Sequence, residues 1–164
     1  MYIKRLGLLA AMVTATSLFA MACFTPADAE SDVAAADDPD LVCLAQAVYF
    51  EARGEPYSGQ IAVAQVVHNR VLDRSKSYCE IVFEGSHRRN ACQFSFACDG
   101  KSDEPTDMVS WDRALRIATL VKSGYMRDLS GNATFYHAHY VSPSWAEQLE
   151  KTVNIGNHIF YRKI

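Results

Sequence analysis

The segment GQIAVAQVVHNRVLDR, residues 59–74, is the feature that most limits how this chain can fold. Its apolar residues point almost all round a helix axis: Ile61 to Ala64, Val66, Val67, Val71 and Leu72. Such a helix has no broad polar face to leave in water, so other elements must cover it on several sides. We expect it in the centre of the domain, with Ser58 as its N-cap. A chain of 164 residues has room for about one such domain.

The helix expected before it carries a glutamate on its apolar stripe. In LVCLAQAVYFEARG the apolar residues follow helical spacing: Leu41, Leu44, Ala45 and Val48. Glu51 comes three residues after Val48 and therefore points with the stripe. Two interpretations stay open. Either burial raises the pKa of Glu51 toward the range of a general acid, or Glu51 forms an ion pair with Arg53 or Arg70.

The rest of the domain alternates between irregular segments and short regular elements. Residues 75–104 are rich in Ser, Cys, Gly, Asn and Asp and lack periodicity, which predicts a long disulfide-braced loop. The elements expected after it are a helix from near Pro105 to Gly124, a strand in NATFYHAHYV, a short helix from Pro143 capped by Ser142 or Ser144 with Glu147, and a strand from Ile159 to Arg162 after a turn at Gly156 and Asn157. The predicted fold is α+β, mainly helical, with a small antiparallel sheet.

Residues 1–29 have the features of a secretory signal peptide. Lys4 and Arg5 precede an uncharged apolar run, and Ala27-Asp28-Ala29 forms a cleavage site of the small-x-small type. A membrane anchor and lipid attachment at Cys23 are the alternatives, but no stop-transfer charges follow the run. We expect secretion across the inner membrane into the periplasm, with no stable membrane insertion after the signal is removed.

An acidic, flexible linker is expected at residues 30–40, between the signal and a domain at residues 41–164. The linker ESDVAAADDPD contains five acids and no base, a composition typical of segments that do not fold alone. The net charge is −3 for the whole chain and +1 for residues 41–164. This balance gives no electrostatic reason to expect nucleic acid as a partner.

The four cysteines of the mature chain are expected to form two disulfides. An even number in an oxidising compartment favours disulfides over a thiol nucleophile or a zinc site. Of the three possible pairings we favour Cys92 with Cys98, which closes a short loop, and this leaves Cys43 with Cys79.

Other residues with catalytic or metal-binding chemistry are less distinctive. Glu55 lies one turn after Glu51 and either completes a carboxylate pair, as retaining glycosidases use, or has a structural role at the helix end. His137 and His139 share one face of a strand. They either line that face as hydrogen-bonding residues or bind a metal, but no third ligand has a convincing spacing. We therefore expect no metal and no cofactor. His68 is expected to be a core or boundary histidine. Some aromatic residues could wall a sugar-binding cleft or belong to the core: Phe94, Phe96, Phe135, Tyr136 and Tyr140.

Four segments in this order resemble the catalytic domain of the SleB-type cell wall hydrolases, the family that includes spore cortex-lytic enzymes. They are YFEARGEPYSGQIAVAQVVHNRV, CQFSFACDG, ATFYHAHYVSPSW and IGNHIFYR, within about residues 41–162. The resemblance implies a lysozyme-like, mainly helical domain that cleaves the glycan strand of peptidoglycan. Glu51 occupies the family's Tyr-x-Glu-Ala-Arg-Gly-Glu glutamate, which makes it the catalytic acid. The other residues that match positions expected near the cleft are Tyr49, Glu55, Gln93, Phe94, Ser95, Tyr136 and His137.

The resemblance to lytic transglycosylases of this family implies a product with a 1,6-anhydro-muramic acid end. The chain departs from the spore enzymes in its four cysteines and in having no separate peptidoglycan-binding repeat domain, which fits a general envelope hydrolase better. A zinc-dependent amidase acting on the stem peptide and a non-catalytic wall-binding module are the alternatives. The product, the preferred peptide decoration and any activating partner stay open.

Overall fold

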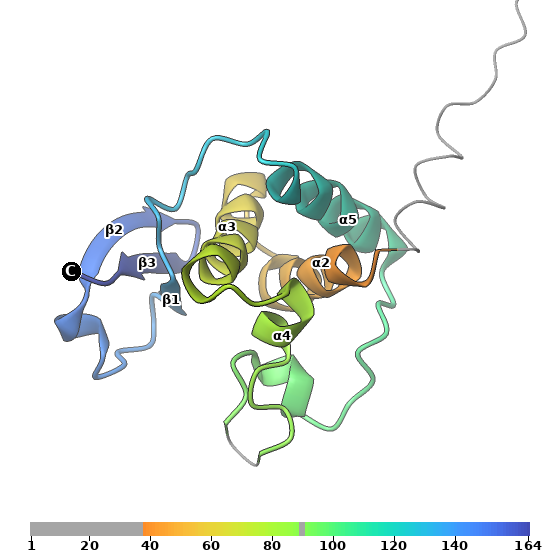
Figure 1. Ribbon diagram of the computed structural model, residues 1–164, viewed down its shortest axis with the longest axis horizontal. Helices are drawn as coiled ribbons and strands as arrows, with labels where there is room; N and C mark the ends of the chain where they lie inside the picture. Colours follow the sequence, from red (N-terminus) through yellow and green to blue (C-terminus); the bar gives the residue numbers. More distant parts are fainter. Residues whose placement is uncertain (1–37, 89–90) are drawn as a thin grey trace, which may run out of the picture.

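The central helix separates a small sheet from the other long helices. The computed structural model describes residues 38–88 and 91–164, and in it α3 (Tyr57–Arg74) lies between the sheet on one side and α2 (Pro39–Ala52) with α5 (Met108–Lys122) on the other (Figure 1). The antiparallel sheet has the order β1 (Phe135–Ala138), β3 (His158–Arg162), β2 (Glu150–Ile155). The predicted α+β class is confirmed.

The core divides at α3, because this helix contributes to two apolar clusters. Ile61, Ala64 and Val67 pack toward α2 and α5. Ala62, Val63 and Val66 pack toward the sheet, where they meet Phe160 of β3. Full burial of a valine or isoleucine stabilises a fold by about 1.5–3 kcal/mol, so a helix buried on both sides is a strong organising element. The central position predicted for it is confirmed.

The ends of the long helices differ from the predicted ends. The helix α2 begins at Pro39, because the Asp38 carboxylate accepts the Leu41 N–H at 3.2 Å and caps the first turn. The last residues of the expected linker therefore belong to the domain. The prediction of Ser58 as the N-cap of α3 was wrong, since that helix already begins at Tyr57 and Pro56 precedes it without a side-chain cap.

The third long helix begins later than its proline suggested. Asp107 caps α5 by accepting the N–H groups of Val109 and Ser110 at 3.1 and 3.2 Å, so Pro105 lies outside the helix. An aspartate side chain that satisfies two free N–H groups defines the start of a helix better than a proline does.

The segment expected to be one long loop contains two short helices. The first is α4 (Tyr78–Val82), which begins with a capping box between Ser77 and Glu80. The second is the 3-10 helix η1 (Ser95–Cys98). A further 3-10 helix, η2 (Ala146–Gln148), has no side-chain cap, so the predicted cap at Ser142 or Ser144 and the predicted capping box between Ser144 and Glu147 were wrong.

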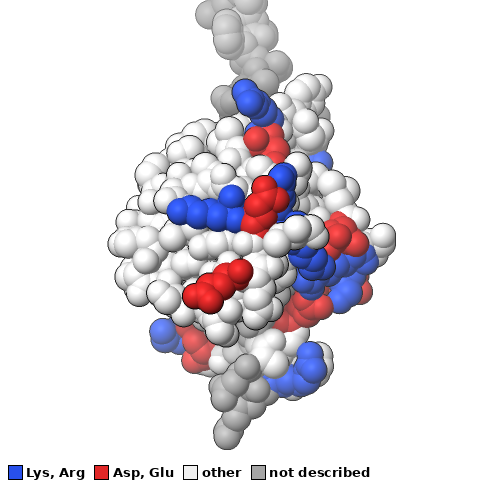
Figure 2. Space-filling view, turned by 90° about the vertical axis from the view of Figure 1, so that its left-hand side faces the viewer, with Lys and Arg blue, Asp and Glu red and all other residues white. Residues whose placement is uncertain are grey.

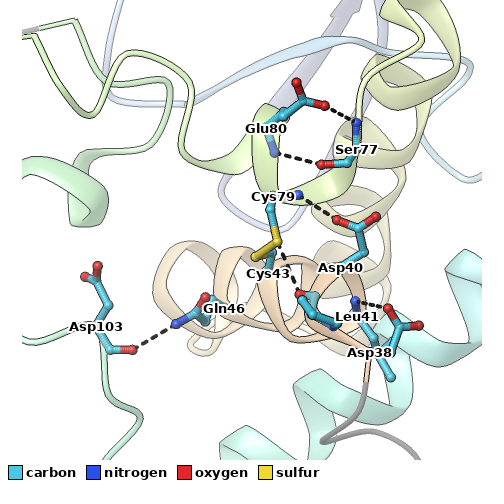
Figure 3. Close-up of a disulfide and its surroundings, with 10 residues drawn as sticks. Asp38, Asp40, Leu41, Cys43, Gln46, Ser77, Cys79, Glu80 and Asp103 are labelled. Carbon is cyan, nitrogen blue, oxygen red and sulfur yellow. Dashed lines mark hydrogen bonds between the residues drawn. A yellow bond between two sulfur atoms is a disulfide. The ribbon is translucent and has the colours of Figure 1, made fainter.

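Two disulfides brace the domain, in the pairing that the sequence favours: Cys43 with Cys79 and Cys92 with Cys98. The first joins α2 to the start of α4 (Figure 3). Next to it, the Cys79 N–H donates to the Asp40 carboxylate at 3.1 Å. The second closes the loop that leads into η1. The first cross-link therefore holds the irregular segment after α3 against the helical body, and the second closes a loop within that segment.

The predicted signal and most of the predicted linker, residues 1–37, lie outside the described residues. In the part that the structure describes, no helix has the length and apolar character that crossing a membrane requires.

Candidate active site

Glu51 lies in the last turn of α2, where the apolar stripe of that helix meets strand β1. The two preceding stripe residues, Leu44 and Val48, are fully buried, whereas Glu51 is partly exposed. The Tyr136 hydroxyl from β1 donates a hydrogen bond to Glu51 Oε2 at 3.3 Å. The carboxyl group thus sits at the boundary between the core and the surface, with one neutral donor as its partner.

Burial raises the pKa of Glu51 above the ordinary value of a glutamate, because desolvation penalises the charged form. The hydrogen bond from Tyr136 and the positive charge of Arg70 oppose this rise without cancelling it. Within the described ranges, no lysine or arginine nitrogen lies within ion-pair distance of Glu51. The structure therefore favours the buried acid over the ion pair, the two interpretations that periodicity leaves open.

The two arginines considered as ion-pair partners have other contacts. The Arg53 guanidinium lies over the Tyr49 ring, 4.9 Å from its centroid. Arg70 is buried, with 4% of its surface exposed, and its Nε donates to the Thr134 carbonyl at 2.6 Å. Thr134 immediately precedes β1, so Arg70 fastens the strand that carries Tyr136 to α3.

The loop before β1 is held by polar side chains of the central helix. The Gln65 amide donates to the Arg127 carbonyl at 2.8 Å and accepts the Leu129 N–H at 2.7 Å. One turn later, the Asn69 amide donates to the Ala133 carbonyl at 3.0 Å. Sequence reasoning missed these roles. Polar residues spaced four apart on an otherwise apolar helix were the available signal.

Alternation along β1 places Tyr136 and His137 on opposite faces of the sheet. Tyr136 pairs with Phe160 in the register and shares the face that meets the helices. His137 lies on the other face, where its Nε2 is 3.0 Å from the Tyr161 hydroxyl and its ring stacks on that of Tyr161. The structure therefore brings Tyr136 to Glu51 and does not bring His137 there, although the resemblance expected both near the cleft.

Glu55 holds a turn of the sheet. Its carboxylate accepts the Asn157 backbone N–H at 2.8 Å and the Asn157 amide at 3.1 Å. The neighbouring Gly156 has φ +58°, and a Cβ there would collide with the Glu55 carboxylate. Glu55 thus has a structural role between the end of α2 and the hairpin of β2 and β3, one of the two roles considered for it.

The remaining residues assigned by resemblance have mixed positions. The Tyr49 hydroxyl is buried and accepts the N–H groups of Thr106 and Asp107 at 3.0 and 2.9 Å, so this residue orients the start of α5. Phe94 is buried beneath the Arg70 guanidinium, whose carbon lies 5.6 Å from the ring centroid. Beside it in sequence, Gln93 is partly exposed and Ser95 is exposed at the start of η1.

In residues 38–88 and 91–164, no cluster of three or more His, Cys, Asp or Glu side chains is arranged to hold a metal ion. His68 Nδ1 lies 2.5 Å from the Tyr78 hydroxyl, in keeping with a boundary histidine whose polar atom has a partner.

An open pocket of about 430 Å³ lies on the outer face of the sheet, away from Glu51. We call it the outer pocket; its polar lining comes from His137, His139, Ser142, Ser144, Glu147 and Tyr161. Figure 2 views the molecule from the side of the sheet, where basic and acidic side chains cross the middle of the face and gather at its right, and the upper left is uncharged. Because Glu51 and Tyr136 do not line this pocket, we base the candidate active site on their contact and the burial of the carboxyl group.

Comparison with known proteins links the chain to cell wall enzymes. Residues 54–161 match the family described as Cell Wall Hydrolase. Spore cortex-lytic enzyme of Halalkalibacterium halodurans is 34% identical over 126 residues, which cover 75% of this chain and 34% of that protein. The enzyme of the same name from Bacillus cereus is 32% identical over 124 residues, 74% of this chain and 43% of that protein. The chain thus matches less than half the length of these relatives.

Two solved structures share the fold. The catalytic domain of the germination-specific lytic transglycosylase SleB from Bacillus anthracis has 29% identity and a TM-score of 0.56, over 75% of this chain and 93% of that one. The catalytic domain of the Bacillus cereus SleB protein has 30% identity and a TM-score of 0.52, over 75% and 89%. The family match begins three residues after Glu51, so the role of Glu51 rests on its motif and on the geometry above.

Proposed function

The chain belongs to the Cell Wall Hydrolase family, and on this premise we propose that it cleaves the glycosidic bond between N-acetylmuramic acid and N-acetylglucosamine in peptidoglycan. The observation that carries the proposal is the Glu51 carboxyl group, which has a raised pKa and a neutral hydroxyl as its hydrogen-bond partner. A carboxyl group whose pKa is raised above the ordinary value is the kind of proton donor that glycoside cleavage uses. The relatives named spore cortex-lytic enzyme and lytic transglycosylase support the same reaction class.

Glu51 serves first as acid and then as base in the proposed mechanism. Its proton passes to the glycosidic oxygen as the bond to C1 of the muramic acid breaks, and the sugar develops oxocarbenium character. The Glu51 carboxylate then takes the proton of the muramic acid C6 hydroxyl, whose oxygen bonds to C1. The products are a 1,6-anhydro end and a free hydroxyl on the leaving sugar, and Glu51 is again protonated.

The intramolecular route needs no second catalytic carboxylate. Glu55, the nearest acid in the motif, already binds Asn157 with both carboxylate oxygens. Its role is therefore to hold the hairpin beside the end of α2. Tyr136 orients Glu51, and we assign substrate contact to Gln93 and Ser95 as part of the same proposal, whereas Phe94 is buried and supports the segment that carries them.

Mass spectrometry of the fragments released from purified peptidoglycan tests the reaction. Anhydro-muramic ends are the expected product. They can be recognised because they are lighter than reducing ends by the mass of one water. Reducing ends would still show glycan cleavage, but they would mean that water attacks C1 in place of the C6 hydroxyl. Release of peptides alone would instead establish an amidase and overturn the proposal.

Chelators should leave the activity unchanged. A zinc amidase would need His137, His139 and a third ligand, but His137 is engaged by Tyr161 and the described residues offer no three-ligand cluster. Turnover of peptidoglycan before and after treatment with EDTA, together with the zinc content of the purified protein, measures this. Stoichiometric zinc whose removal abolishes turnover would contradict the expectation.

Replacing Arg70 with methionine should extend the activity to higher pH. The Arg70 charge lowers the pKa of Glu51, so removing it raises that pKa further. A general acid works only while protonated, and the rate falls as pH rises through its pKa. The falling limb of kcat/KM against pH should therefore move upward in Arg70→Met and much less in Arg70→Lys, which keeps the charge. A limb that stays in place or moves downward would contradict this electrostatic role.

Export to the periplasm is part of the proposal. It is supported by the signal-like sequence of residues 1–29 and by the two disulfides, which persist in oxidising compartments. Peptidoglycan is then the partner that the enzyme meets. Fractionation of the producing cells, with detection of a shortened chain outside the inner membrane, tests it.

A further inference from the structure

The outer pocket has a rigid aromatic floor. The His137 ring is fixed through both nitrogens, with Nδ1 2.9 Å from the Ala138 carbonyl oxygen and Nε2 3.0 Å from the Tyr161 hydroxyl. Trp145 packs edge-on against His137 and Tyr161, with ring centroids 5.6 Å apart in each pair. These contacts press the segment that carries Trp145 onto the sheet. The pocket is therefore formed before any ligand arrives, which reduces the entropic cost of binding.

The rim of the pocket presents polar groups that the fold does not use. Ser142, Ser144 and Glu147 line the pocket and are exposed, and their side chains make no hydrogen bond to any described residue. No lysine or arginine is among the described residues that line it, and Glu147 supplies a negative charge. An anionic ligand such as a phosphate or a peptide carboxylate would therefore meet repulsion without a compensating cation.

The lining matches an uncharged ligand with both apolar and hydroxyl groups. Val141, Pro143, Ala146 and Ile159 supply apolar surface between the polar groups. Sugar rings combine apolar C–H faces, which pack on aromatic and aliphatic side chains, with hydroxyls that bind carboxylates, serines and imidazoles. An acetamido group adds a methyl for the apolar part. The volume of about 430 Å³ lies within the range of small-molecule sites.

We propose that the outer pocket is a second, non-catalytic binding site for an N-acetylated amino sugar of the glycan. It shares the glycan polymer with the proposed function, but it does not depend on Glu51 or on bond cleavage. A second contact on the same polymer raises the local concentration of glycan at the enzyme, so binding to intact peptidoglycan exceeds binding to short fragments.

The test uses chitotriose, the N-acetylglucosamine trimer, titrated into the ¹⁵N-labelled protein. We expect amide shifts at residues 137–147 and 159–161, in Glu51→Gln as in the parent. Ala146→Tyr fills the pocket and should raise the Kd for chitotriose, measured from these shifts, by about tenfold or more, a loss of about 1.4 kcal/mol. Gln148→Tyr, which adds the same ring two residues away on an exposed position outside the lining, should not.

Ser144→Trp at the exposed rim is the second variant, for the case that Ala146→Tyr does not fold. Shifts that stay at full affinity in a folded filling variant would overturn the proposal. So would shifts confined to residues around Glu51 and Tyr136, or a pocket that responds to a stem tetrapeptide and not to chitotriose. If the pocket binds chitotriose but peptidoglycan releases no glycan fragments, the second site stands and the proposed catalytic activity fails.

Discussion

Glu51→Gln should lower the rate of glycan cleavage by about 10²–10⁴-fold, the usual contribution of general acid–base catalysis, while the protein stays folded. Glutamine keeps the shape of the side chain and can still accept the hydrogen bond from Tyr136, but it has no proton to donate to the glycosidic oxygen. The measurement is turnover on purified peptidoglycan, with the fold checked by circular dichroism.

The same variant should also change how the stability of the protein depends on pH. Burial raises the pKa of Glu51 in the folded state, so its stabilising share is fully present below the unfolded pKa and is lost as pH rises through the folded pKa. Glutamine does not titrate. The stability of Glu51→Gln relative to the parent should therefore increase as pH rises from the unfolded pKa of a glutamate through the raised folded pKa, and the difference should stay constant above it. Thermal unfolding at several pH values measures this trend.

Glu55→Gln is the matched control, because it makes the same chemical change four residues away. Glu55 binds the Asn157 backbone and side chain, so its loss should destabilise the hairpin and lower the melting temperature. A hydrogen bond to a charged group is worth about 1.5–3 kcal/mol. Activity should fall less than in Glu51→Gln. If Glu55→Gln is the inactive variant and Glu51→Gln keeps most of its activity, the assignment of the acid is wrong.

Periodicity was sufficient to predict the central helix and the inward direction of Glu51. Both follow from positions three and four residues apart within one helix, and local spacing determines such geometry. The partner of Glu51 was not determined in this way. Whether Tyr136 or His137 faces the helices depends on which face of β1 packs against α3, and a shift of one residue exchanges the two faces. The resemblance named both residues, and only the folded sheet separated them.

Whether a missed feature could have been predicted depends on how far along the chain the interacting residues lie from one another. The capping box of α4 is written in four residues, Ser77 to Glu80, so this short helix was predictable from a local signal. The roles of Gln65, Asn69 and Arg70 were not, because their partners lie in the loop around residues 127–134, about 60 residues further along the chain. Their polarity indicated a polar contact but could not identify it.

Removing the Cys43–Cys79 disulfide should lower the free energy of unfolding of the domain more than removing the Cys92–Cys98 disulfide does. The cross-link joins residues 36 apart, and the chain-entropy relation gives about 4 kcal/mol for a loop of this size. The same relation gives about 2 kcal/mol for Cys92–Cys98, whose residues are only 6 apart. A domain of this size has a free energy of unfolding of about 5–15 kcal/mol, so the first loss consumes a large part of it.

The structure gives a second reason to expect a greater loss of stability without Cys43–Cys79 than without Cys92–Cys98. Cys43 of α2 is buried in the apolar core, and Cys79 lies in the first turn of α4, where its N–H donates to the Asp40 carboxylate, so this disulfide connects two elements of the helical body. Cys98 is exposed and closes a surface loop. Denaturant unfolding of the variants Cys43→Ala/Cys79→Ala and Cys92→Ala/Cys98→Ala compares the two losses, and thiol titration of the unfolded parent should find none of these four cysteines free. Four reactive thiols, or a greater loss from the Cys92/Cys98 pair, would contradict the expectation that the longer cross-link dominates the stability of the domain.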